Sequence, residues 1–135
     1  MPSPAHRGQR VLVVDDDQEF GTAASLLLIA SGYEVVGQPG TAADGLSAAV
    51  ELRPDVVLLD ISLPDGNGFD VAKQLTELEN PAALIMISSR EGPGLRAAAC
   101  ESGARGFLPK SKFSIAGIRA LLDGIASESS CGADG

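Results

Sequence analysis

The sequence has no tryptophan, and aromatic residues make up only 4% of its 135 residues. A core must therefore come mainly from aliphatic residues, which suit helices packed on a parallel sheet. The chain also lacks an apolar run near the roughly 18 residues of a membrane span, and its first residues lack a signal-type apolar segment. We therefore expect a cytoplasmic protein that does not contact a membrane.

Basic residues are scarce, since ten Lys and Arg against eighteen Asp and Glu give a formal charge of −8. This is the wrong sign for binding nucleic acid through its phosphates, so we expect this chain to contact no nucleic acid. Cysteine is scarce too, and Cys100 and Cys131 lie far apart without the spacing of a metal site. We predict that both are free thiols in a reducing compartment.

A chain of this length is the size of one domain. Short apolar strands alternate with helical segments, which predicts a parallel sheet with right-handed crossovers. The expected fold class is α/β, a doubly wound five-stranded parallel sheet with the flavodoxin-like order 2-1-3-4-5 and helices on both faces. The predicted strands are 11–14, 34–36, 56–60, 84–87 and 106–108, and the predicted helices are about 18–31, 42–53, 69–78, 95–103 and 114–125.

The two ends of the chain differ in composition from its middle. Residues 1–9 are rich in Pro, Ser, Gly and Arg, and residues 127–135 read SESSCGADG. We expect both tails to be disordered and residues 10–126 to form the folded domain.

Polar side chains stand at the ends of four predicted strands. Asp15 and Asp16 follow the first strand, and Asp60 ends the third. Ser88 follows the fourth strand and Lys110 follows the fifth. In the predicted order these strands are neighbours, and open α/β sheets bind ligands at their carboxyl ends. Carboxylates in one crevice repel one another unless a cation is present, so we expect Mg²⁺, for which Mn²⁺ could substitute, with Asp16 and Asp60 as direct ligands.

A carboxylate beside such an ion can attack a phosphoryl group and form an acyl phosphate. Phosphoryl transfer needs positioning and neutralisation of charge, which Lys110 would assist, and the Ser88 hydroxyl could donate a hydrogen bond to the phosphate. Taken singly, these residues have simpler explanations, because acids after a strand often cap the next helix and the others could be ordinary loop residues. Their coincidence at four adjacent strand ends favours phosphoryl transfer.

Four segments, VLVVDDD, VVLLDISLPDGNGFD, LIMISSR and GARGFLPKS, together resemble the motifs of the response regulator receiver domain, the phosphoacceptor module of two-component signalling. The resemblance covers roughly residues 10–126. It implies that Asp60 is the phosphorylated aspartate. It also implies that Asp16 binds Mg²⁺ directly, Asp15 binds it largely through water, and the backbone carbonyl of Ser62 is the third protein ligand.

The same resemblance assigns Ser88 as the switch hydroxyl, Phe107 as the switch aromatic and Lys110 as the lysine of the motif. It implies that a histidine kinase or a phosphotransfer protein donates the phosphoryl group to Asp60. The domain would then shift conformation to control an output such as transcription. Such a domain is not an enzyme, and only self-phosphorylation from a donor and slow autodephosphorylation are expected.

The resemblance also implies a dimer or partner face on the fourth helix, fifth strand and fifth helix. Ala98, Ile118 and Leu122 could contribute to this face or to the core. Many receivers place proline after the motif lysine, whereas Ser111 follows Lys110 here. The Lys-Ser pair resembles receivers of the LuxR-type helix-turn-helix subfamily, so we expect either a single-domain regulator or a receiver from a longer protein.

Other functions fit the sequence less well. A haloacid-dehalogenase-like phosphatase using Asp15 and Asp17 shares the aspartyl-phosphate chemistry, but normally has Gly-Thr after the second acid, where this chain has Gln18-Glu19. A pseudo-receiver that serves only protein contacts would require a degenerate site, whereas all the site groups are present. A Rossmann-type nucleotide binder needs a Gly-rich loop where the first strand is followed by acids.

Overall fold

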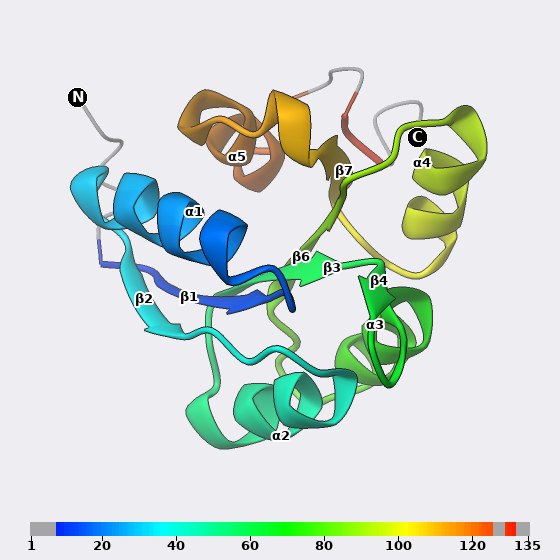
Figure 1. Cartoon of the computed structure of the whole chain (residues 1–135), viewed down its shortest axis with the longest axis horizontal. Coiled ribbons are helices and arrows are strands. Elements are labelled where there is room, and N and C mark those ends of the chain that lie inside the picture. The colour runs from blue at the N-terminus through cyan, green and yellow to red at the C-terminus, as the bar shows by residue number, and fades with distance from the viewer. Residues whose placement is uncertain (1–7, 126–128, 132–135) are drawn as a thin grey trace.

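The computed structural model describes residues 8–125 and 129–131. A five-stranded parallel sheet with the order β2-β1-β3-β6-β7 lies at its centre (Figure 1). This confirms the predicted fold class and strand order. The sheet strands are β1 (Arg10–Val14), β2 (Glu34–Gly37), β3 (Val56–Asp60), β6 (Ala83–Ser88) and β7 (Gly106–Pro109).

Helices cover both faces of the sheet. The helices are α1 (Gln18–Ala30), α2 (Ala42–Leu52), α3 (Gly68–Thr76), α4 (Pro93–Glu101) and α5 (Ile115–Leu122), with a short 3₁₀ helix η2 (Lys110–Lys112) after β7. Figure 1 shows α1 and α5 together on one side of the sheet and α2 and α3 on the other. Within the described residues, no helix is long and apolar enough to cross a membrane.

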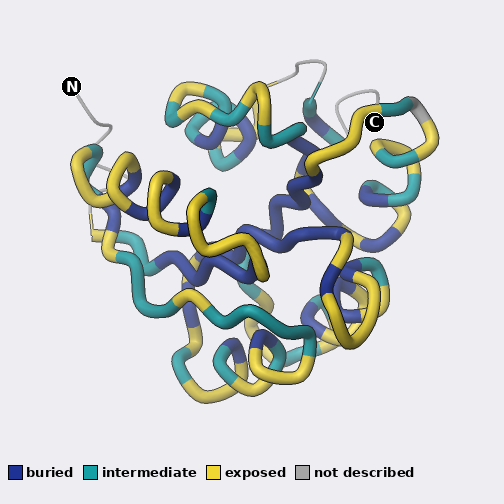
Figure 2. Tube along the Cα trace, viewed as in Figure 1, coloured by how far each residue is buried: buried dark blue, intermediate teal, exposed yellow. Residues whose placement is uncertain are grey.

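Alternating side chains of the strands fill two separate cores. Val57 and Leu59 of β3 pack on the side of α2, α3 and α4, whereas Val56 and Leu58 pack on the side of α1 and α5. Every residue of β3 is therefore buried, as the dark central trace in Figure 2 shows. Burial on both faces explains why the strands of this parallel sheet read as continuous aliphatic runs.

Side-chain caps fix where α1, α2 and α3 begin. The Asp17 carboxylate accepts a hydrogen bond from the Phe20 N–H at the start of α1. Thr41 caps α2 and Asn67 caps α3 in the same way. The helix bounds differ from the prediction, because α3 and α5 end earlier than predicted and α4 both begins and ends two residues earlier. A two-stranded hairpin, β4 (Ser62–Leu63) with β5 (Gly66–Asn67), also precedes α3.

The prediction of two free thiols is wrong. Cys100 and Cys131 form a disulfide with their Cα atoms 5.4 Å apart. The two cysteines are 31 residues apart in the sequence but close in space. The Cys131 N–H donates a hydrogen bond to the carbonyl of Arg105, the residue before β7. Ser130 also forms an antiparallel bridge with Gly106. The sequence supplied no periodic pattern that would reveal this pairing.

The prediction of a disordered C-terminal tail does not hold for residues 129–131, which pair with β7. The remaining tail residues, 126–128 and 132–135, lie outside the described residues, as do residues 1–7 of the N-terminal tail.

The start of α3 passes very close to the end of β3, and only glycine fits there. A Cβ atom on Gly68 would overlap the Asp60 carbonyl oxygen and lie 3.0 Å from the Ile61 Cα. We expect Gly68→Ala to lower the free energy of unfolding by about 2 kcal/mol, because backbone has to move. Chemical unfolding measures this change.

Gly94→Ala is the matched control, since Gly94 also lies in the first turn of a helix and a Cβ atom there would meet nothing within 4 Å. This variant should be as stable as the wild type or slightly more stable. Equal effects of the two substitutions would contradict the close approach at Gly68.

Candidate functional site

The carboxyl ends of β1, β3, β6 and β7 lie side by side in the sheet. Asp15 and Asp16 directly follow β1, and Asp60 is the last residue of β3. Ser88 is the last residue of β6, and Lys110 directly follows β7. The structure therefore brings the predicted strand-end residues to one edge of the sheet.

Lys110 forms ion pairs with two buried carboxylates. Its Nζ lies 2.7 Å from Oδ2 of Asp15 and 3.4 Å from Oδ2 of Asp60. The Lys110 side chain is only 13% exposed, so these charges are poorly screened by solvent. Two carboxylates thus share one ammonium group.

An aromatic pair lies against the lysine from α1 and the segment after η2. The Lys110 Nζ lies 4.9 Å from the centroid of the Phe20 ring, within the range of a cation–π interaction. The Phe20 ring in turn meets Phe113 edge to face, with centroids 5.5 Å apart. The sequence did not predict this contact, because no local signal links residues so far apart in the chain.

Backbone N–H groups hold the other oxygens of the two carboxylates. The Ser62 N–H donates to Oδ1 of Asp60 at 3.2 Å, and the Asp17 N–H donates to Oδ1 of Asp15 at 2.9 Å. Each Oδ1 is thereby fixed by its own loop. In both residues the other oxygen, Oδ2, faces Lys110.

The carboxylates of Asp15, Asp16 and Asp60 form a cluster that could hold a cation. One oxygen from each residue lies within 4.8 Å of the others. Asp15 and Asp60 are buried, whereas Asp16 is exposed. An all-oxygen donor set with one solvent-facing member suits a hard divalent ion that keeps part of its water shell, which is the preference of Mg²⁺.

Burial, followed by the negative charge of Asp15, raises the pKa of the Asp60 carboxyl from 3.8 to about 6. Lys110 and the Ser62 N–H act in the opposite direction. Burial works to lower the pKa of Lys110, but its hydrogen bond to Asp15 and the charge of Asp60 outweigh this and raise the pKa. The lysine therefore stays charged, whereas the ionised form of Asp60 is less favourable in the folded protein than in water.

The remaining predicted site residues lie around this cluster. The Ser88 hydroxyl is buried and accepts a hydrogen bond from the Arg90 N–H at 3.0 Å. Phe107 is buried in β7, where it pairs in register with Met86 and packs on the side of the sheet covered by α2, α3 and α4. The Ser62 side chain is exposed at the start of the β4–β5 hairpin.

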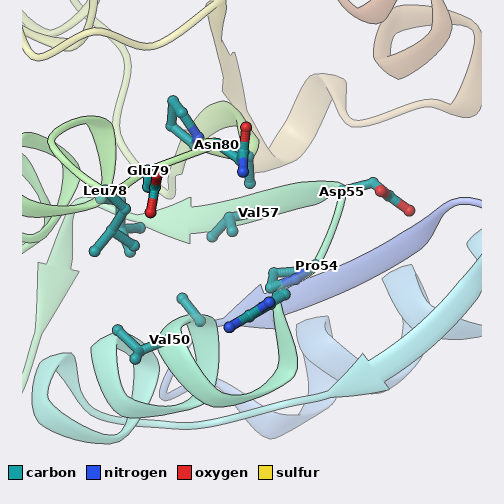
Figure 3. A pocket seen from close by; sticks show the side chains of 12 residues that line it. Val50, Pro54, Asp55, Val57, Leu78, Glu79 and Asn80 are labelled. Carbon is teal, nitrogen blue, oxygen red and sulfur yellow. The ribbon is translucent and has the colours of Figure 1, made fainter.

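A depression of about 460 Å³ lies elsewhere, between α2 and the segment that follows α3 (Figure 3). Pro54 and Asp55, which precede β3, line it together with Val50 and Leu78. It is therefore at the amino-terminal end of β3, away from the carboxylate cluster. The chemistry suggested by the cluster does not involve this depression.

The sequence and fold match known proteins over most of the chain. Residues 11–123 match the family model of the response regulator receiver domain. The chemotaxis protein CheY of Thermotoga maritima is 31% identical over 103 residues, which is 76% of this chain and 86% of that protein. The transcriptional regulatory protein PrrA of Mycobacterium tuberculosis is 37% identical over 119 residues, covering 84% of this chain and 49% of that protein.

A solved structure extends the agreement to three dimensions. The signal receiver domain of NarL from Mycobacterium tuberculosis superposes with a TM-score of 0.79 at 32% identity, covering 87% of this chain and 95% of that one. The chain spans about half the length of the transcription regulators that it matches, such as BvgA and PrrA. A parallel sheet in the 2-1-3-4-5 order, a strand-end cluster of acids and lysine, and these matches lead to one conclusion. The chain belongs to the response regulator receiver domain family.

Proposed function

We propose that this phosphoacceptor domain takes its phosphoryl group on Asp60. The observation that carries the proposal is the placement of the Asp60 carboxylate, which lies buried at a strand end, 3.4 Å from the Lys110 Nζ and clustered with the carboxylates of Asp15 and Asp16. Burial leaves the carboxylate less stabilised by solvent than it would be in water, which makes it a more reactive nucleophile. Lys110 and a bound cation would offset the negative charge that the phosphoryl group adds.

The reaction transfers the phosphoryl group from a phosphohistidine of a histidine kinase or phosphotransfer protein. An oxygen of Asp60 forms the new O–P bond while the N–P bond to the donor imidazole breaks, and the imidazole nitrogen keeps the electron pair. The acceptor must be ionised to attack, which the Ser62 N–H and Lys110 favour. The domain turns over no separate substrate, because the product is its own acyl phosphate.

The acid cluster fits Mg²⁺, with Asp16 and Asp60 as direct ligands, Asp15 largely through water and the Ser62 carbonyl as a further ligand. When bound, the ion neutralises negative charge on the carboxylates and on the phosphoryl group. Mn²⁺ could occupy the same oxygen donors. Two ionised carboxylates beside one lysine, together with exposed Asp16, leave an excess of negative charge that supports this assignment.

Lys110 and Ser88 would bind the phosphoryl oxygens. Lys110 already reaches Asp60, and its ammonium has three donors, so it can contact a phosphoryl oxygen and still pair with Asp15. The Ser88 hydroxyl accepts from the Arg90 N–H, which leaves its own proton for donation. Because Phe107 has no hydroxyl, its part in the conformational switch would be a change of packing.

The partners follow from the family. We propose cytoplasmic phosphorylation by a histidine kinase, a homodimer face on α4, β7 and α5, and control of transcription through a domain or partner beyond this chain. Ala98 and Leu122 are partly exposed and remain candidates for that face. Ile118 is fully buried, so it belongs to the core and not to a contact surface.

The structure does not favour a haloacid-dehalogenase-like phosphatase, for which Asp17 would be the second catalytic acid. The Asp17 carboxylate accepts the Phe20 N–H as the cap of α1, and it is not part of the acid cluster. A pseudo-receiver is also disfavoured, because the acids, the hydroxyl and the lysine meet at one sheet edge.

Asp60→Asn should abolish phosphorylation. We expect incubation of the wild type with acetyl phosphate and Mg²⁺ to add one phosphoryl group, and the amide variant to gain none because it lacks the nucleophilic oxygen. Intact-mass spectrometry measures the adduct. Asp17→Asn is the control, since asparagine also caps helices well and should leave phosphorylation unchanged. An adduct on the Asp60 variant would contradict the assignment.

Without divalent cations, Asp60→Asn should stabilise the domain at pH 7.5. The folded state binds the Asp60 proton more tightly than the unfolded state. The free energy of unfolding therefore falls as pH rises from about 4 to about 6 and Asp60 loses its proton. Removing its charge should raise the free energy of unfolding by up to about 3 kcal/mol above pH 6 and by much less near pH 4.5. Urea unfolding in a chelator at both pH values tests this, and a pH-independent difference would contradict it.

Mg²⁺ should stabilise the wild type more than Asp16→Asn. A ligand that binds only the folded state raises the melting temperature by mass action, and loss of one ligand oxygen weakens binding. Melting curves in millimolar MgCl₂ and in chelator measure the shift. Asp17→Asn, one residue away and outside the cluster, should keep the full shift. Equal shifts in all three proteins would exclude Asp16 as a ligand.

A further inference from the structure

Residues 129–131 cover the open edge of the sheet at β7. The Phe107 N–H donates to the Ser129 carbonyl at 2.9 Å, and the Cys131 N–H donates to the Arg105 carbonyl at 2.7 Å. β7 is the last strand in the sheet order, so these bonds satisfy backbone groups that would otherwise face solvent. The segment acts as a short sixth strand that is antiparallel to β7.

The same segment is fastened to α4. Cys131 is joined by its disulfide to Cys100, near the end of that helix. The Arg96 guanidinium, also on α4, donates a hydrogen bond to the Ser130 carbonyl. The segment therefore links α4 to β7, and the disulfide is the covalent part of the link.

The hydrogen bonds alone make a weak attachment. A pairing of so few residues is marginal in water when nothing else holds it. The disulfide removes most of the freedom that the segment would otherwise recover on leaving β7. The state of this bond should therefore decide whether the segment stays docked.

Both cysteines can be reached from solvent. Each is partly exposed, and together they line a surface depression of about 510 Å³ with Arg105 and Ser130. Thiol–disulfide exchange requires a thiolate to attack one of the sulfur atoms, so an accessible disulfide is the kind that exchanges. A disulfide enclosed in the core would resist such an attack.

We propose that the Cys100–Cys131 disulfide is a reversible thiol switch that sets whether residues 129–131 stay docked on β7. The reductant is a dithiol, whose first thiolate attacks one sulfur to form a mixed disulfide. This attack releases one protein thiolate. The second thiolate of the dithiol then attacks the mixed disulfide and releases the other protein thiolate. Two electrons pass to Cys100 and Cys131, which take up the two protons of the dithiol, and the dithiol becomes a disulfide. Reversal needs a disulfide oxidant.

Reversibility rests partly on the proposed cytoplasmic function, because disulfides in that compartment are usually transient and redox-sensing. Reduction has a defined structural consequence. The Phe107 N–H and the Arg105 carbonyl lose their partners in the segment, and β7 becomes an open edge that another strand could pair with. α4 also loses its covalent tie to this edge.

The test compares the native protein with and without dithiothreitol. Alkylation with iodoacetamide followed by intact-mass spectrometry should show two added groups after reduction and none before it. Hydrogen exchange of the Phe107 amide should then accelerate by about tenfold or more. Once the disulfide is reduced it no longer holds the segment on β7, so the hydrogen bond from the Phe107 N–H to the Ser129 carbonyl opens more often. Amides of β3, at the centre of the sheet, should keep their exchange rates.

Cys131→Ser supplies the matched variant. It should show the fast Phe107 exchange with and without dithiothreitol, while slow exchange in β3 reports that it is folded. Resistance of the native disulfide to dithiothreitol would overturn the proposal, and so would unchanged Phe107 exchange after reduction. Asp60→Asn should respond to dithiothreitol as the wild type does. Loss of the exchange response therefore contradicts the thiol switch, whereas failure of acetyl phosphate to label the wild type contradicts the proposed phosphoacceptor site.

Discussion

The burial of two carboxylates against one lysine is the constraint on which the site depends. Asp15 and Asp60 both point Oδ2 at the Lys110 ammonium, in surroundings that exclude most solvent. Removing a carboxylate from water is costly, and one ammonium cannot balance two charges. Burial, followed by the negative charge of Asp15, raises the pKa of Asp60 to about 6. A bound cation, alone or together with a transferred phosphoryl group, would offset the negative charge that the fold buries at this site.

The sheet makes this arrangement possible. Aliphatic side chains fill both faces of β1, β3 and β6, so the strands are held rigidly and only their ends are free to carry polar groups. The parallel arrangement brings those ends together from distant parts of the chain. The tight contact between Gly68 and the Asp60 carbonyl then fixes the loop whose Ser62 N–H donates to the Asp60 carboxylate.

The sequence was sufficient to predict the sheet order and the strand-end residues, because these depend on repeated and local signals. Aliphatic runs marked the strands, and Asp60 stood where such a run met a Pro/Gly turn. Contacts without a periodic signal were missed. The Phe20 ring beside Lys110 brings together α1 and η2, which are far apart in the chain. The Cys100–Cys131 bond depends on three residues pairing with a strand edge. The segment SESSCGADG resembles a disordered tail by composition, and only the position of residues 129–131 in space shows that these three pair with β7.

The proposed phosphoacceptor and the proposed metal site would form one electrostatic unit, because both include the Asp60 carboxylate. NMR can follow the side-chain carboxyl carbon of Asp60 while pH is varied, first in chelator and then with Mg²⁺. We predict a pKa of about 6 without metal and a clear decrease of this pKa when Mg²⁺ is added. A pKa near its ordinary value in chelator, with no response to Mg²⁺, would show that the two sites are not coupled.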